Sequence, residues 1–309
     1  MRRAGILGSI IVLGVVAAVV AAVVGAGAQQ PPQMAPIGKI QKVKDNLYTI
    51  FGQGGNTLVF LTANGAVVVD TKLANNGQAI LDQITSITNK PVTTIINTHT
   101  HGDHVGSNDA FPASVEIIAQ ENTKAGMAKM TPPLKPVAMP DRTFKDTLTL
   151  NAGADRIDLY YFGRGHTGGD AIVVFPSARA AAVGDLFAWK QPPYVDAMNG
   201  GSPVELPATL EKAAKAITNV DTVISGHMEP LQKWSDLVDY AEFNRAVLTA
   251  VQNAKKAGRT ADQAAAELKL PAKFASYMTG SVPGVPDEMI GTAKQRSDGN
   301  VKAIYAELK

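Results

Sequence analysis

The chain contains no cysteine among its 309 residues. Disulfide bonds and lipid attachment through cysteine are therefore excluded, and the fold must depend on core packing and bound groups. Aromatic residues are also few, at 6%, although hydrophobic residues make up 45% of the chain. A chain of this length and composition can bury a large core, so we expect an α/β domain with appended helices.

A strong net charge is also missing. Lys and Arg number 29 against 27 Asp and Glu, and two of the basic residues, Arg2 and Arg3, lie in the amino-terminal leader. Without those two the charges balance, and no basic stripe for binding phosphates is visible. We therefore expect a small-molecule substrate and no nucleic-acid partner, and the sequence leaves the oligomeric state open.

Residues 1–28 have the composition of a targeting segment. Arg2 and Arg3 precede a stretch without charged residues, which ends in Ala26-Gly-Ala28. A positive start, an apolar run and small residues before the cleavage point are typical of a secretory signal. The apolar run also reaches the roughly 20 residues that span a bilayer. We expect a cleaved signal peptide or a membrane anchor, and export to the periplasm or secretion in either case.

The rest of the chain alternates between strand and helix patterns. A Pro- and Gln-rich linker is predicted at 29–38, and residues 75–87 have a helical pattern that begins at Asn75-Asn76. Short β-branched and apolar runs predict two sets of strands, one in each half of the chain. The two halves therefore have similar predicted patterns, each a sheet flanked by helices. The predicted strands are 40–43, 47–51, 58–62, 66–69 and 92–97 in the first half, and 147–150, 157–162, 171–175, 178–183 and 222–225 in the second.

Helical patterns dominate the last third of the chain. Capping boxes at Ser202–Glu205 and Thr260–Gln263 predict helices, the first running from Pro203 to about Ile217. A long apolar face follows Pro230, and a last helix is expected after Gly299-Asn300. We therefore predict a catalytic domain at 39–230 and a helical extension at 231–309.

The histidines are few and clustered. Three of the five lie in the motif His99-x-His101-x-Asp103-His104, which begins two residues after the predicted strand 92–97. The others are His166, within Gly-His-Thr-Gly-Gly-Asp, and His227, within Ser-Gly-His. Imidazole with nearby carboxylate is the ligand set that suits zinc, so these motifs predict a metal site.

The geometry of the first motif indicates that one loop can serve two metals. In an extended segment, residues two apart point to the same side. On that basis His99, His101 and Asp103 would face one way and His104 another. A solvated loop is the ordinary interpretation of a lone His-x-His, but here every histidine of the chain lies in such a motif.

In the order and spacing of these motifs, together with Asp185 in Gly184-Asp-Leu-Phe187, the chain resembles the metallo-β-lactamase superfamily. The resemblance in strand pattern extends from about Lys39 to Pro230. It implies an αβ/βα sandwich, here followed by the helical extension, and a metallohydrolase activity with two divalent ions. Zinc is the first expectation for the metal, with iron or manganese as alternatives.

The resemblance also implies a division of labour among the ligands. One metal would be held by three histidines, the other by Asp103 and two histidines, and Asp185 would bridge the two ions. True β-lactamases of the superfamily usually have cysteine or serine at the bridging position, whereas glyoxalase II and lactonases have aspartate. The ligands of the first metal would be His99, His101 and His166, and those of the second would be Asp103, His104 and His227.

Three reactions are compatible with this ligand set. The first is attack of a metal-bridging hydroxide on a thioester, lactone or cyclic ester. In this reaction Asp103 would either orient the water and pass a proton to the leaving group, or serve only as a metal ligand. The second is β-lactam hydrolysis, for which Asp185 is less typical. The third is iron-dependent persulfide oxidation, against which the presence of His104 and His227 argues.

Other residues are candidates for supporting roles. Asp70 and Asp170 are candidates for accepting a hydrogen bond from a ligand imidazole. Lys190 and Tyr194 could contact an anionic substrate group, although a surface lysine and a packing tyrosine are the simpler interpretations. Loops at 187–201 and 277–289, rich in Pro, Gly and aromatic residues, are the expected walls of a substrate pocket.

Overall fold

The computed structural model describes residues 36–282 and 287–308. The leader predicted at 1–28 and most of the linker predicted at 29–38 lie outside these residues. Within the described part, no helix is both long enough and apolar enough to cross a membrane.

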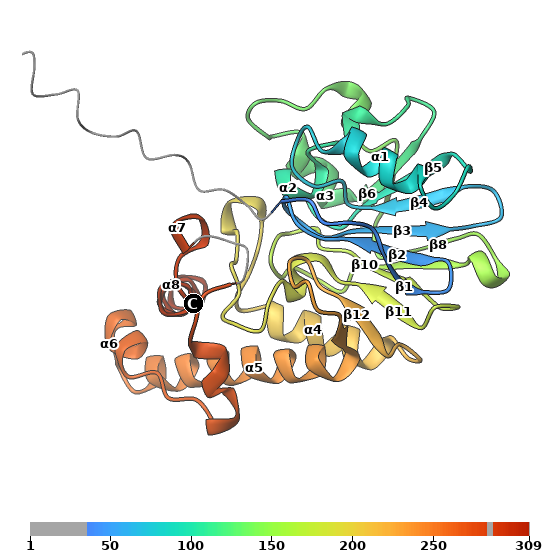
Figure 1. The fold of residues 1–309 in the computed structure, drawn as a ribbon. Coiled ribbons are helices and arrows are strands. Elements are labelled where there is room, and N and C mark those ends of the chain that lie inside the picture. Colours follow the sequence, from blue (N-terminus) through green and yellow to red (C-terminus); the bar gives the residue numbers. More distant parts are fainter. Residues whose placement is uncertain (1–35, 283–286, 309) are drawn as a thin grey trace, which may run out of the picture. The chain divides into compact units, whose positions relative to one another are not determined.

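The first half of the described chain builds a seven-stranded sheet in which the spatial order of the strands follows the sequence (Figure 1). The first four strands pair in antiparallel fashion and the last three are parallel to β4. The strands are β1 (Gln41–Lys44), β2 (Leu47–Ile50), β3 (Thr57–Leu61), β4 (Ala66–Val69), β5 (Val92–Asn97), β6 (Glu116–Gln120) and β7 (Arg142–Phe144).

The second half builds a six-stranded sheet that is antiparallel except for one pair. β11 and β12 are parallel, so both end at the same edge of the sheet. In spatial order the strands are β13 (Gln232–Lys233), β12 (Thr222–Ile224), β11 (Ala180–Ala182), β10 (Ile172–Phe175), β9 (Ile157–Tyr160) and β8 (Thr147–Leu150).

An apolar core joins the two sheets. The side chains of Val67 and Val69 on β4 pack into it, together with Val173 and Phe175 on β10. The rings of Phe60 and Phe175 lie 4.9 Å apart between centroids, one ring from each sheet. Because strand side chains alternate in direction, Ala66 and Val68 face away from this core and pack against another layer.

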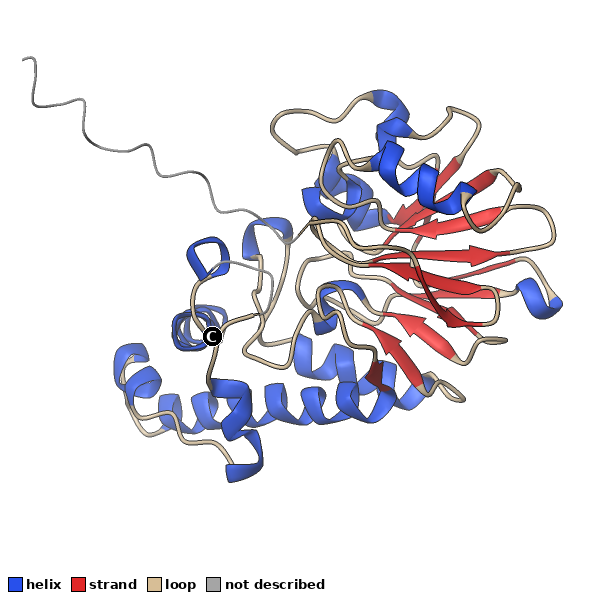
Figure 2. Cartoon of the chain, in the orientation of Figure 1, coloured by secondary structure: helices blue, strands red, loops and turns tan. Residues whose placement is uncertain are grey.

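Helices cover the outer faces of both sheets (Figure 2). Helix α1 (Gly77–Thr85) buries Ile80 and Ile84 against the outer face of the first sheet. The outer face of the second sheet packs on α4 (Leu206–Ala216) and α5 (Trp234–Lys256). The described chain is thus an αβ/βα sandwich, and the fold class expected from the sequence is confirmed.

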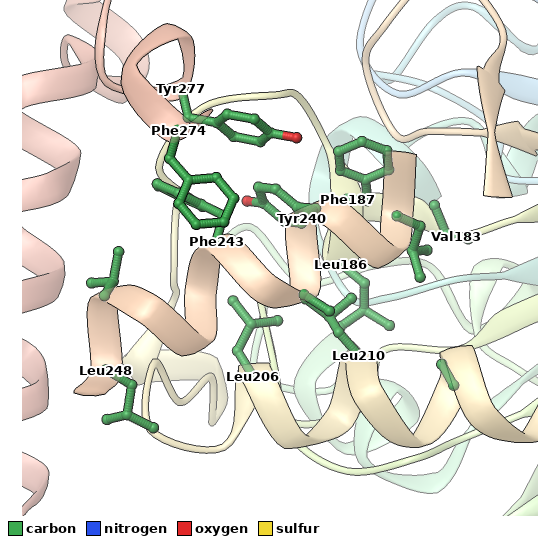
Figure 3. Packing of buried hydrophobic residues seen from close by; sticks show 14 of the residues in the cluster. Val183, Leu186, Phe187, Leu206, Leu210, Tyr240, Phe243, Leu248, Phe274 and Tyr277 are labelled. Carbon is green, nitrogen blue, oxygen red and sulfur yellow. The ribbon is translucent and has the colours of Figure 1, made fainter. Parts of the chain in front are cut away.

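The carboxyl-terminal helices share the second outer core. Tyr240 and Phe243 of α5 pack in one cluster with Leu210 of α4 and Phe187 (Figure 3). Leu237 of α5 belongs to the same cluster. Helices α6 (Ala261–Ala266) and α8 (Ala293–Glu307) continue this cluster, and the short α7 (Asp287–Ile290) precedes α8. The helical character predicted for 231–309 is confirmed, and α5 buries the same sheet that carries part of the site.

The structure corrects two predicted helix starts. Helix α4 begins at Leu206 rather than Pro203, and residues 203–205 form a turn. Ser202 Oγ accepts the Glu205 N–H at 3.0 Å and donates to Glu307 at 2.6 Å. Helix α8 begins at Ala293, well before Gly299-Asn300, because Thr292 and Gln295 form a capping box. Strands β6 and β7 were not predicted, whereas the capping box at Thr260 is confirmed.

Candidate metal centre

The candidate ligands lie on loops that leave the same edge of both sheets. His99 and His101 follow β5 directly, and Asp103 and His104 lie on the four-residue helix α2 (Gly102–Val105). His166 lies between β9 and β10, Asp185 in the helical turn Gly184–Phe187 after β11, and His227 after β12. Rigid strands thus aim seven side chains from distant parts of the sequence at one place.

The first group consists of His99, His101, His166 and Asp185. Each residue offers one ligand atom, and these atoms all lie within 4.8 Å of one another. His101 Nδ1 is 2.9 Å from His166 Nε2, which is 3.6 Å from Asp185 Oδ2.

The second group consists of Asp103, His104 and His227, whose ligand atoms are equally close. Asp103 Oδ2 is 3.4 Å from His227 Nε2, and His104 Nε2 is also 3.4 Å from His227 Nε2. The extended-chain argument had placed Asp103 on the side of His99 and His101, which is wrong. The chain turns into α2 at Gly102, so Asp103 and His104 belong to the same group.

Asp185 lies between the two groups. Its Oδ1 is 3.4 Å from His104 Nε2, and its Oδ2 is 3.2 Å from His227 Nε2, in addition to the contact with His166. Asp103, the other carboxylate of the two groups, is close only to imidazoles of the second group, at 3.4 Å from His227 Nε2 and 3.8 Å from His104 Nε2. This is the geometry expected of a bridging carboxylate.

The imidazoles are oriented by hydrogen bonds to their remaining ring nitrogens. His104 Nδ1 is 2.7 Å from Asp70 Oδ2, and Asp70 also accepts from the N–H and hydroxyl of Thr98. His101 Nε2 is 2.9 Å from Asp196 Oδ2, and His166 Nδ1 is 2.7 Å from the carbonyl of Tyr194. Carboxylate and carbonyl partners of this kind fix the ring nitrogen that faces a metal.

The sequence identified only part of this supporting layer. The role expected of Asp70 is confirmed, but that expected of Asp170 is wrong, because Asp170 accepts from the N–H and hydroxyl of Thr167 and so stabilises the turn after His166. Asp196 was missed. The only signal was its position in the 187–201 loop, which had been interpreted as a pocket wall.

Two glycines pack directly against ligands. A Cβ added at Gly55 would lie 2.2 Å from His104 Cε1, and one added at Gly226 would lie 1.8 Å from Asp185 Oδ1. Neither approach leaves room for a methyl group. Residues 52–55 form a bend, and its last glycine packs directly against the His104 ring.

Electrostatics in the cluster favour a bound cation. Burial lowers the pKa of His99 well below its usual range, so this imidazole is neutral. Burial would also lower the pKa of His104, but Asp103, Asp70 and Asp185 outweigh it and raise that pKa well above its usual range. Burial would raise the pKa of Asp185, but His227 and His104 hold it well below its usual range.

The donor set fits divalent metal ions. His99 Nε2 and Asp185 Oδ1 are buried, face the cluster and have no hydrogen-bond partner in the described residues. Buried polar atoms without partners are rare, and a ligand-binding role explains them. Five imidazoles with carboxylates suit zinc and also accept iron or manganese.

A cavity of about 450 Å³ opens over both groups. Trp189, Tyr194 and Asp196 line it from the first predicted wall loop, which is confirmed. Of the second predicted wall, 277–289, only Met289 lines the cavity, and it lies with Ile290 on α7. Lys190 does not line the cavity. It pairs with Asp236 at 2.9 Å, which agrees with the simpler interpretation of a surface lysine.

Lys72 is a buried residue that the sequence analysis missed. Its ammonium donates to the carbonyls of Ile50 and Gly55, at 2.8 and 2.9 Å. Through Gly55 it supports the loop that packs against His104. Burial lowers the pKa of Lys72 to about 7, although Asp70 and Asp103 act in the opposite direction.

Comparison with known proteins agrees with this architecture. The model of the metallo-beta-lactamase superfamily matches residues 51–227, more than half of the chain. The protein therefore belongs to the metallo-β-lactamase superfamily, whose members typically bind two metal ions. The recognition made from the motifs is confirmed.

Individual relatives are distant. The chain is 27% identical over 214 residues to the metallo-beta-lactamase type 2 of Elizabethkingia meningoseptica, covering 66% of this chain and 82% of that protein. The corresponding enzyme of Bacteroides fragilis is 23% identical over 214 residues, covering 65% of this chain and 83% of that protein.

Solved structures share the fold at low identity. A metallo-beta-lactamase from Pontibacter korlensis matches with a TM-score of 0.58 and 20% identity, covering 68% of this chain and 99% of that one. A stereoselective inverting sec-alkylsulfatase from Pseudomonas sp. matches with a TM-score of 0.67 and 15% identity, covering 88% of this chain and 50% of that one. The wider coverage shows that this second likeness extends beyond the superfamily domain.

The two ligand groups predict two metal ions per chain. Replacing His227 with Ala should weaken the second site more than the first, because His227 belongs to the second group and the first group keeps all its members. Metal analysis after dialysis against a graded series of chelator concentrations should then show one tightly held ion instead of two. Wild-type protein that never holds more than one ion under metal-replete conditions would contradict the assignment.

Lys72 predicts a pH-dependent stability. Its pKa is lowered from 10.5 to about 7 by folding, so between these values the unfolded chain holds the proton and the folded chain releases it. The free energy of unfolding should therefore rise with pH across this window, by at most about 1.4 kcal/mol per pH unit.

The Lys72→Met variant lacks the titrating group and is the control. The difference in the free energy of unfolding between wild type and Lys72→Met, measured by urea denaturation, should increase from pH 7 to pH 10. A difference that stays constant over this range would show that the Lys72 ammonium is not perturbed.

Proposed function

We propose that the protein hydrolyses a carbonyl-centred bond of a small molecule, in a thioester, lactone or other cyclic ester, with two divalent metal ions. The observation that carries the proposal is the position of Asp185 between two complete ligand groups. We propose zinc as the metal, with iron or manganese as the alternatives that His and Asp ligands also accept.

The proposed division of labour follows the groups. His99, His101 and His166 would hold one ion, Asp103, His104 and His227 the other, and Asp185 would contact both. When bound, two such ions supply water with a pKa near neutrality and an electrophile that polarises the substrate carbonyl. The chain itself needs no serine or cysteine nucleophile for this reaction.

Residues of the chain would position the water, transfer the proton and orient the ligand imidazoles. Asp103 is the catalytic candidate, because its side chain lines the cavity and Oδ2 is 3.4 Å from His227 Nε2. From this place it can hold the attacking water in position and pass a proton to the leaving group. Asp70 and Asp196 keep His104 and His101 in the ring orientation that the ligand roles require.

β-Lactam hydrolysis is the second candidate. The type 2 metallo-beta-lactamases among the relatives favour it. Asp185 favours the first candidate, because the bridging position of glyoxalase II and lactonases holds aspartate. A persulfide dioxygenase activity is the weakest of the three, because a single iron would leave Asp103, His104 and His227 without a use.

The role of Asp185 predicts the behaviour of Asp185→Asn. Asparagine is nearly isosteric but uncharged, so it should preserve the fold while disturbing the charge balance between the two ions. We expect kcat for lactone hydrolysis to fall on the order of 100-fold, with an unchanged circular dichroism spectrum. Unchanged turnover would remove Asp185 from the reaction.

A substrate panel separates the candidates. Purified, metal-loaded protein should hydrolyse lactones or thioesters with a higher kcat/KM than nitrocefin, a chromogenic β-lactam. A higher kcat/KM for nitrocefin would favour the β-lactamase candidate instead, and the Asp185→Asn variant shows in either case whether the reaction uses this centre.

Export is proposed from the leader alone. If Ala26-Gly-Ala28 is a cleavage site, amino-terminal sequencing of the native protein should find Gln29 in the soluble periplasmic or secreted fraction. If the apolar run stays as an anchor, the membrane fraction should contain the intact amino terminus. A cytoplasmic product that retains the leader would contradict both forms of the proposal.

A further inference from the structure

Much of the cavity lining beside the candidate ligands is apolar. Its wall is formed by Leu73, Trp189, Tyr194, Met289 and Ile290, and the Trp189 ring lies 5.7 Å from the His227 ring between centroids. Trp189 is almost fully buried, at 4% exposure, so the cavity meets a packed ring rather than a mobile one. Substrate groups beyond the reacting bond must lie against this wall.

The cavity has no cationic side chain in its described lining. The charged groups in the lining are carboxylates, namely Asp103, Asp185 and Asp196, beside the ligand imidazoles. A substrate anion would therefore find no arginine or lysine partner along these walls.

The cationic side chains near the cavity already form hydrogen bonds or ion pairs within the protein. The Arg296 guanidinium carbon lies 5.2 Å from the Trp189 ring, but its N–H groups donate to the Pro192 carbonyl at 2.9 Å and to Gly291 and Gln191. Lys72 donates to two buried carbonyls and Lys190 pairs with Asp236.

These same contacts hold the apolar walls in place. Gln191 Nε2 donates to the carbonyls of Thr279 and Ser281, at 3.1 and 3.2 Å. Arg296 links the Trp189 loop, through Pro192, to Gly291, which follows Met289 and Ile290 directly. The part of the apolar wall formed by Met289 and Ile290 thus comes from the carboxyl-terminal extension and is fixed to the loop after Asp185.

We propose that the substrate is electrically neutral and bears an apolar aliphatic or aromatic group next to the bond that is cleaved. A neutral lactone or ester of this kind gains free energy by burying its apolar group against Trp189, Met289 and Ile290. A carboxylate against this wall would lose its hydration without an arginine or lysine partner. Penicillins and cephalosporins carry such a carboxylate. A sulfate ester likewise carries a negative charge. The inference rests on the proposed function for the reacting bond.

A matched pair of substrates tests the charge preference. The pair is a γ-lactone with a hexyl side chain and the same lactone whose side chain ends in a carboxylate. With metal-loaded full-length protein we expect kcat/KM to be about tenfold higher or more for the neutral lactone. Equal or higher kcat/KM for the acid, or for a secondary alkyl sulfate, would overturn the inference.

Met289 offers a gain-of-function test. Met289→Lys places a cation at the cavity rim, so the ratio of kcat/KM for acid over neutral lactone should rise several-fold. Met198→Lys is the matched control, because Met198 is 94% exposed and does not line the cavity, and it should leave the ratio unchanged. An unchanged ratio in Met289→Lys, or an equal rise in the control, would contradict the proposed contact.

A binding measurement separates this inference from the proposed function. The chain has two tryptophans, so Trp234→Phe leaves Trp189 as a fluorescent reporter in the cavity. Cyclopentanones that carry the same two side chains cannot be hydrolysed and serve as probes. Quenching at a lower concentration of the neutral ketone supports the inference even if no lactone is hydrolysed, and tighter binding of the acid overturns it.

Discussion

The contact of Asp185 with imidazoles from both ligand groups depends on one strand pairing and on the packing of the two sheets. Parallel pairing of β11 with β12 brings the turn that carries Asp185 beside the loop that carries His227. Packing of the two sheets brings the same carboxylate to within 3.4 Å of His104 Nε2, which belongs to the first sheet. The close approach of Gly226 leaves Asp185 no space in which to move away. A buried carboxylate among imidazoles is stable only with its charge compensated, and a pair of divalent ions held by these ligands would provide that compensation.

The site therefore depends on the whole sandwich. Ligands from the β5 loop and α2 come from the first sheet, whereas His166, Asp185 and His227 come from the second. The inter-sheet core around Phe60 and Phe175 sets the distance between them. Helix α5 covers the outer face of the second sheet, and the residues that follow it reach the cavity through Met289 and Ile290. The extension thus contributes to both the core and the pocket.

Much of the centre could be predicted from the sequence because histidine is so sparse. Each of the five histidines reaches the cluster. Asp70 contacts His104 through a hydrogen bond, as its position at the end of a strand suggested. Asp196 could not be found in this way, because it lies about 95 residues from His101 in a loop without periodicity. Lys72 is similar: a lysine after a strand usually reaches solvent, and only the tertiary structure shows that it is enclosed.

The direction in which a ligand side chain points and the ends of the helices were harder to predict than which residues belong to the centre. Asp103 faces the second group because the chain turns into α2 at Gly102, a change that an alternating pattern cannot show. Helix α8 continues through Gly299 and Asn300 because the Asn300 side chain donates to the Pro193 carbonyl at 2.9 Å inside the fold. These are tertiary contacts that override local preference.

Anomalous diffraction at the metal absorption edge, from crystals of the metal-loaded protein, tests the central claim most directly. The account predicts two peaks, one among His99, His101 and His166 and one among Asp103, His104 and His227, with Asp185 beside both. A single peak, or two peaks of which Asp185 contacts only one, would contradict it.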